Sequence, residues 1–276
     1  MTIRERLSLG TQCVHEALRM VWQDPKLVWY VFYVALYWVV FAIFFAVGLG
    51  VGVFLFKSIG WWASVCAVPA AVCFVWAVYK SALMTAALNE AVFVRHEQRL
   101  LTFNESRALV HGYRRRVINW ILIYVAIEGA LAVVSSSADL SQRWYLRVIA
   151  MMLMVPFRMA EFYSMAALVK ERIAACRSFV VSFKLTAHNL LTTLWAIVWS
   201  AIIMATVLLL VTAPAVGLFV LARWLHTLVW WVVCSVLAAP FVVCAIVTFL
   251  WLATAWAALP ATLYARLSKG PSIAIF

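Results

Sequence analysis

Formal charge is almost absent from the last third of this sequence. Between Lys184 and Arg266 the only charged residue is Arg223, and the run from Leu27 to Phe56 has no charged residue at all. A helix that crosses a bilayer needs about 20 mainly apolar residues. The core of a soluble domain could not bury uncharged, apolar runs of this length. The sequence therefore predicts a chain whose helices lie in lipid.

The amino-acid composition also predicts a membrane protein. The chain has 276 residues, of which 67% are hydrophobic and 12% charged, whereas soluble domains are about half apolar and a quarter charged. Its 15 Trp and 17 Phe residues are typical of bilayer proteins, where aromatic rings gather at the interfaces. The net charge of +12 could indicate nucleic acid, but the cations flank apolar runs. Membrane lipid, anionic in particular, is therefore the expected partner, and no nucleic acid is expected.

We expect an all-α integral membrane protein with six spans. The first four run over 27–56, 59–79 with helix continuing to about residue 89, 117–134, and 146–169. Lys57, Ser58 and Gly60 predict one outer turn, and the polar segment 135–139 predicts another. The last two spans are expected over about 190–213 and 227–264. Three shorter spans, interrupted near Pro214 and Pro240, are the alternative.

The distribution of cations supports two spans in the last third. With six spans, one side of the membrane holds only Lys57, Arg143, Arg147 and Arg223. Sixteen cations fall on the other side. Because Lys and Arg stay in the cytosol, this bias places both termini there, in a bacterial inner (cytoplasmic) membrane.

The spans are expected to form three repeated hairpins within one membrane domain, 1–276. Each hairpin follows a short amphipathic interfacial helix, over 9–21, 103–113 and 179–188, and the second of these should start at the Thr102–Glu105 capping box. Ala86–Leu88 and Ala166–Leu168 end the second and fourth spans, 80 residues apart, and Ala261–Leu263 is a weaker third copy. The repeat-like units are about 8–94, 102–173 and 178–268.

Three stretches carry a resemblance to a known family. These are TAALNEAVFVRHEQRLLTFNESRALVHGYRRRVINWILIY at 85–124, the spacing from Glu171 to Ser182, and the ending ATLYARLSKGP with its Leu-Tyr pair. Together they resemble a widespread family of bacterial six-span membrane proteins of unknown function. Members often have a proline just before the acidic residue of the basic linker that follows the fourth span, which is Glu171 in this chain. Here Ala166 and Ala167 occupy that region, and the proline is absent. The resemblance implies a fold but no activity.

Four ionisable side chains lie deep in the predicted spans: Lys80, Glu128, Arg158 and Glu161. At 1.5 Å per residue, Glu128 is about 18 Å of helix from Arg116, and Arg158 is about 18 Å from Lys170. Glu161 follows Arg158 by one turn, and the lysine lies about 15 Å inside its helix end. Charges in a bilayer normally face the bundle and pair. We expect a midplane network in which Glu128 and Arg158 are partners, and which either fixes hairpin docking or binds a charged amphiphile.

A second group of candidate residues lies in the first basic linker and is expected to contact lipid headgroups: Arg95, Arg99, Arg107, Arg114, Arg115 and Arg116. The last three fan over roughly 200° of helix immediately before a span. That geometry suits an interfacial collar on lipid phosphates.

The residues needed for catalysis are scarce. The five histidines show no metal-ligand spacing, the six cysteines form no CxxC motif, and Asp24 and Asp139 are the only aspartates. We expect no catalytic residue, no metal, no cofactor and no enzyme activity. The expected role is a non-enzymatic structural or accessory membrane component that contacts lipid and partner proteins. The alternative is a transporter or flippase that uses the midplane charges.

Overall fold

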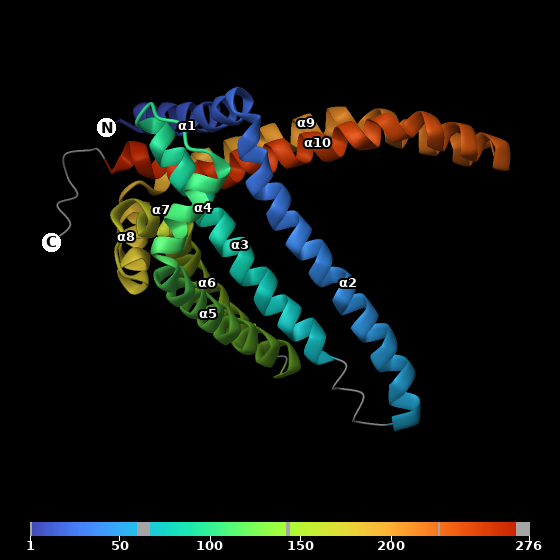
Figure 1. The fold of residues 1–276 in the computed structure, drawn as a ribbon, viewed down its shortest axis with the longest axis horizontal. Helices are drawn as coiled ribbons and strands as arrows, with labels where there is room; N and C mark the ends of the chain where they lie inside the picture. Colours follow the sequence, from blue (N-terminus) through green and yellow to red (C-terminus); the bar gives the residue numbers. More distant parts are fainter. Residues whose placement is uncertain (1, 60–66, 142–143, 226, 269–276) are drawn as a thin grey trace. The chain divides into compact units, whose positions relative to one another are not determined.

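The computed structural model is all-α and describes residues 2–59, 67–141, 144–225 and 227–268 (Figure 1). No strand occurs in these ranges. The chain divides into two compact units, one formed by 1–28 with 189–259 and the other by 29–188 with 260–276. Each unit therefore joins segments that are distant in the sequence, and each is described separately below.

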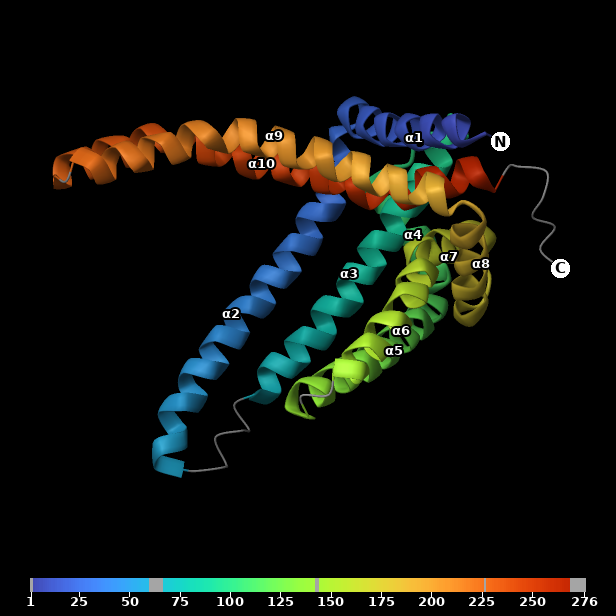
Figure 2. The ribbon, with the colours of Figure 1, turned by 180° about the vertical axis from the view of Figure 1, so that it is seen from behind.

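The first unit contains α1 (Ile3–Gln23), the short η1 (Pro25–Leu27), α9 (Leu190–Leu225) and most of α10 (Leu228–Leu267). The amphipathic α1 starts earlier than the predicted residue 9, because Thr2 and Glu5 form a capping box. It packs against α9 at Gly10, where a Cβ atom would lie 2.9 Å from the Thr192 carbonyl oxygen. Only glycine permits this approach. The helices α9 and α10 run alongside each other in both views (Figures 1 and 2).

The second unit contains seven complete helices among its described residues and the end of α10. Their bounds are α2 (Val28–Ile59), α3 (Ala67–His96), α4 (Phe103–Gly112), α5 (Arg114–Ser141), α6 (Trp144–Phe162), α7 (Ser164–Glu171) and α8 (Ala175–His188). Edge-on ring contacts, such as that of Tyr37 with Trp76 at a centroid distance of 5.0 Å, join α2 to α3. The helix α6 packs on α5 and α8.

The buried core of the second unit includes the three predicted repeat triplets, which lie toward the C-terminal ends of α3, α7 and α10. Every residue of these triplets is at most 1% exposed: Ala86–Leu88, Ala166–Leu168 and Ala261–Leu263. Small side chains at such positions permit close helix approach. Tyr30 fastens α2 to this region, since its hydroxyl lies 2.5 Å from Ser106 Oγ and its ring packs against Phe103. The core therefore concentrates at one end of the unit.

Two predicted outer turns are not turns over the residues named for them. The helix α2 continues through Lys57 and Ser58 to Ile59, and Gly60 lies outside the described residues. Similarly, α5 runs through the polar segment 135–139 as far as Ser141. Serine is tolerated there because a helix can satisfy its hydroxyl, and Ser136 Oγ donates to the Val133 carbonyl at 3.0 Å.

The predicted fourth span is broken at Tyr163, between α6 and α7. In a continuous helix the Tyr163 N–H would donate to the Met159 carbonyl. Instead it donates to Ser182 Oγ at 2.9 Å, and that hydroxyl donates to the Met159 carbonyl at 3.3 Å. Thr186 Oγ1 donates to the same carbonyl at 2.9 Å. A hydroxyl inserted into the backbone ladder bends a helix, and here it comes from α8.

Five helical stretches of the described chain are long and apolar enough to cross a membrane. They are Pro25–Gly48, Ala71–His96, Arg114–Val133, Leu190–Leu225 and Val229–Leu267. The chain thus has the character of a multi-pass membrane protein. The helix α6 is not among the five, and its 19 residues contain Arg147, Arg158 and Glu161. The last third forms two long helices, and α9 passes through Pro214 without ending.

Candidate functional site

Three charged side chains meet between α5 and α6, and we call them the mid-span triad: Glu128, Arg158 and Glu161. One guanidinium nitrogen, Arg158 Nη2, lies 2.7 Å from Glu128 Oε1, and the other, Nη1, lies 2.6 Å from Glu161 Oε2. The expected contact between Glu128 and Arg158 is therefore present, and Glu161 joins it. One cation faces two carboxylates, so the triad has a formal surplus of one negative charge.

The mid-span triad lies next to an aromatic cluster but is not enclosed by it. Phe157 and Phe179 stack at 6.2 Å, and Trp120 and Tyr124 extend the stack along α5. The Arg158 side chain nevertheless remains 47% exposed, and the two carboxylate side chains are 28% and 25% exposed. The triad is thus reachable from the surface of the second unit.

Lys80 does not join the triad, contrary to the predicted network of four charges. It lies on α3, half-buried, with its ammonium group 5.9 Å from the centroid of the Tyr79 ring. Within the described ranges no carboxylate lies within ion-pair distance of it. The prediction used depth alone, whereas pairing also requires that the side chains lie on facing sides of neighbouring helices.

A second network connects the ends of four helices. We call it the helix-end network: Glu90, Glu97, Tyr113, Lys170, Glu171, Arg172 and Tyr264. At its centre, Arg172 Nη2 lies 2.7 Å from Glu90 Oε1, and the guanidinium stacks 4.0 Å from the centre of the Tyr113 ring. The Tyr113 hydroxyl donates to Glu90 at 3.4 Å. Burial, reinforced by the nearby carboxylate, raises the pKa of Tyr113, so this hydroxyl keeps its proton.

The backbone of Arg172 positions this side chain. Arg172 caps the end of α7 in the left-handed conformation, with φ 53° and ψ 31°. That conformation costs a non-glycine residue about 1 kcal/mol or more. The ion pair with Glu90 and the stacking on Tyr113, both made from this left-handed position, offset the strain.

The rest of the helix-end network attaches the end of α10 and the far end of α3. The Tyr264 hydroxyl donates to Glu171 Oε1, and the Tyr264 ring packs edge-on against Phe93. Lys170 Nζ donates to Glu97 at 2.8 Å and lies 5.4 Å from the centre of the Phe93 ring. The network therefore joins α3, α4, α7 and α10 where they end.

The helix-end network was not predicted as a site from the sequence. Glu90 and Arg172 are 82 residues apart, and neither has an ionic partner within a helical turn. A signal was nevertheless present. The resemblance rested partly on Glu171, Ser182 and the Leu-Tyr pair that ends with Tyr264, and the structure places these residues in the network or at the neighbouring helix break.

The arginines predicted to contact lipid headgroups lie at the same end of the second unit, around α4, and we call them the basic cluster: Arg95, Arg99, Arg107, Arg114, Arg115 and Arg116. The predicted capping box is present, with Thr102 and Glu105 exchanging hydrogen bonds, and these bonds lower the pKa of Glu105. Arg107 lies 5.4 Å from the Phe103 ring. The side chains of Arg114–Arg116 are exposed in the first turn of α5. Cations in the first turn oppose the helix dipole, so an anion near them would be stabilised both by the guanidinium groups and by the helix terminus.

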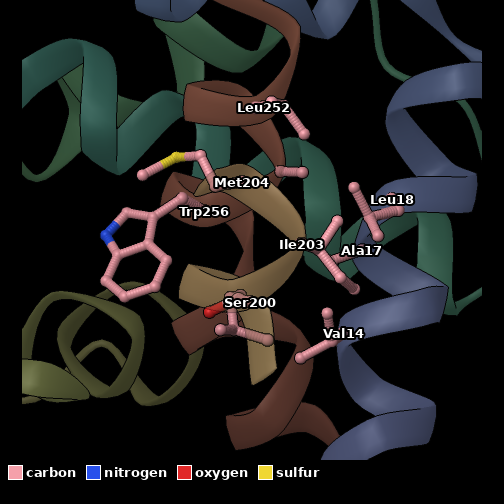
Figure 3. Close-up of a pocket in the computed structure, with 10 residues that line it drawn as sticks. Val14, Ala17, Leu18, Ser200, Ile203, Met204, Leu252 and Trp256 are labelled. Atoms are coloured by element: carbon pink, nitrogen blue, oxygen red, sulfur yellow. The ribbon is translucent and has the colours of Figure 1, made fainter. Parts of the chain in front are cut away.

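The first unit has a small pocket between α1, α9 and α10 (Figure 3). Its lining is apolar apart from Ser200, whose hydroxyl donates to the Ile197 carbonyl of its own helix at 2.9 Å. Figure 3 shows Trp256 and Met204 opposite the α1 residues Val14 and Leu18. The pocket offers no convergent polar groups, so it lacks the features of a site for a polar ligand.

Metal-ligating side chains do not cluster in the part of the chain that the structure describes: no group of three or more His, Cys, Asp or Glu could hold an ion. Comparisons with protein-family models, curated proteins and solved structures found no match to this chain. Function is therefore inferred from the triad, the helix-end network and the basic cluster.

Proposed function

We propose that this chain is a non-enzymatic structural or accessory component of a bacterial cytoplasmic membrane, acting through lipid and protein contacts. It crosses the membrane six times, with α6 as the additional crossing, and both termini lie in the cytosol together with the basic linkers over 95–116 and 170–184. The three buried triplets support a repeat of three hairpins. Membership of the six-span family that it resembles is part of the same proposal.

The helix-end network is the observation that carries this proposal. Its described carboxylates each face a cation or a hydroxyl, as Glu90 faces Arg172 and Glu171 faces Tyr264. Networks that are fully paired rigidify a structure, and this one joins helices that the repeat would otherwise leave as separate hairpins. Such pairing suits a scaffold better than a site that must exchange a substrate.

The transporter or flippase remains the second candidate, and two observations favour it. The break at Tyr163 interrupts the helix that carries Arg158, and broken helices are common at transporter binding sites. The triad also has one surplus carboxylate. The property that would distinguish this candidate is movement of an amphiphile across proteoliposomes, which an accessory component would not catalyse.

The proposed topology predicts opposite labelling of two introduced cysteines. In a cysteine-free background, Ser137→Cys should react in whole cells with a membrane-impermeant thiol reagent, whereas Ser268→Cys should not. The reason is the sixteen-to-four cation bias, which retains the basic linkers in the cytosol. Permeabilised cells provide the control, since both positions should then react. The reverse pattern would overturn the orientation.

The basic cluster predicts retention of anionic lipid. Replacing Arg114, Arg115 and Arg116 together with glutamine should weaken retention of anionic phospholipid severalfold or more, because each cation near such a surface contributes about 1 kcal/mol. Mass spectrometry of lipids that co-purify in mild detergent gives the measurement. The matched control replaces the same residues with lysine and should retain most of the lipid. Equal lipid content in all three proteins would contradict lipid binding by the cluster.

A further inference from the structure

The four charges predicted near the membrane midplane, two cations and two carboxylates, balance only when the mid-span triad and Lys80 are added together. The mid-span triad has one cation for two carboxylates, and its members are 25–47% exposed. Lys80 supplies one further cation but lies on a different helix, without a carboxylate partner in the described ranges. A single copy of the unit thus presents a negative site and a positive site, each incompletely compensated.

Lys80 and the triad lie at similar depth. Lys80 is ten residues before Glu90, which corresponds to about 15 Å of helix from the helix-end network. Glu128 is twelve residues after Arg116, about 18 Å from the basic cluster at the same end of the unit. In two copies inserted into the membrane in the same orientation, Lys80 and the triad lie at similar depth. Lys80 of one copy can therefore contact the triad of the other without a shift along the membrane normal.

We propose that the chain self-associates in the membrane, with Lys80 of one copy pairing with the surplus carboxylate of the mid-span triad of a second copy. The contact is reciprocal in a two-fold dimer, where each copy contributes its lysine and receives its neighbour's. This inference rests on the membrane-spanning arrangement proposed above, and its test does not depend on lipid binding.

Charge complementarity identifies a second copy as the partner. Ionisable groups within a bilayer are retained where they pair. A triad facing only another triad would bring two surplus negative charges together and would repel. A lysine facing the triad restores neutrality, and this chain supplies that lysine at the right depth. No other macromolecule is needed to account for both sites.

The test is energy transfer between donor-labelled and acceptor-labelled copies in dilute proteoliposomes. Wild-type copies should associate. Lys80→Gln alone, or Glu128→Gln alone, should weaken association about three- to twentyfold for each ion pair that can no longer form. Mixing Lys80→Gln donors with Glu128→Gln acceptors should restore part of the transfer, because one of the two reciprocal ion pairs survives only in the mixed pair. Lys184→Gln, an exposed change on α8, is the control and should associate like wild type.

Three outcomes would overturn the proposal. Wild-type copies could show no energy transfer above the dilution baseline. The single variants could associate as strongly as wild type. Alternatively, the mixed pair could transfer no better than either variant alone, which would mean that Lys80 and the triad balance within one chain. Thermal unfolding of each variant, measured in parallel, excludes loss of fold as the cause of reduced transfer.

Discussion

Arg158→Gln should destabilise the protein by about 2–3 kcal/mol, below the range for removing one member of a fully buried ion pair, because the Arg158 side chain is 47% exposed. The loss is large because two carboxylates, Glu128 and Glu161, both rely on this guanidinium. Glu128→Gln should cost much less, since Arg158 keeps Glu161 and the remaining pair is neutral. The triad therefore predicts a strong asymmetry between replacing the cation and replacing either anion.

The measurement is a mutant cycle on unfolding in mixed micelles at increasing SDS. The triple replacement of Arg158, Glu128 and Glu161 with glutamine should recover much of the stability that Arg158→Gln removes, because no charge remains unpaired. Additive losses across the cycle would show that the three residues do not interact. Equal losses for Arg158→Gln and Glu128→Gln would instead indicate a simple pair without Glu161.

Arg172→Met should be the most damaging change in the helix-end network, with a loss of about 2–3 kcal/mol. The Glu90 carboxylate would then have no cation beside it while only 10% exposed, and unpaired buried charge is strongly unfavourable. We place the loss below the full range because the Arg172 side chain is 39% exposed and partly screened by solvent. Methionine keeps an unbranched apolar side chain at this position, so the change removes the charge together with its stacking on the Tyr113 ring.

A matched variant separates the charge from the backbone. Arg172→Gly also removes the cation, but glycine adopts the left-handed cap without strain. It should therefore be more stable than Arg172→Met by about 1 kcal/mol. Unfolding in mixed micelles compares the two directly. If both variants match wild type, Glu90 does not depend on Arg172, and the helix-end network is not what joins these helices.

Local patterns predicted the elements that depend on neighbouring residues. The capping box at Thr102 set the start of α4, and the uncharged runs predicted two long helices in the last third. Equal depth along the helices was sufficient to predict the contact of Glu128 with Arg158, because consecutive helices joined by a short connection lie side by side. The first two of these predictions used information that lies close together in the sequence, and the third followed from the short connection between consecutive helices.

The features that were missed depend on interactions between distant residues. The break at Tyr163 requires a hydroxyl supplied 19 residues later by Ser182, and no local propensity encodes it. The pair of Glu90 and Arg172 requires a left-handed cap whose position the sequence does not mark. Lys80 was assigned to the midplane network from depth alone, and in the described ranges no carboxylate lies within ion-pair distance of it.

The concentration of the core at one end of the second unit affects how its helices meet the bilayer. In α3 the buried residues run mainly from Ala82 to Phe93, and α2 is anchored near its start through Tyr30. Farther along their described parts, ring contacts such as that of Tyr37 with Trp76 join α2 and α3 to each other. Tilting is how a long apolar helix adjusts to a thinner membrane. We therefore expect α2 and α3 to adjust to bilayers of different thickness by tilting as a pair, while their anchored ends keep their packing.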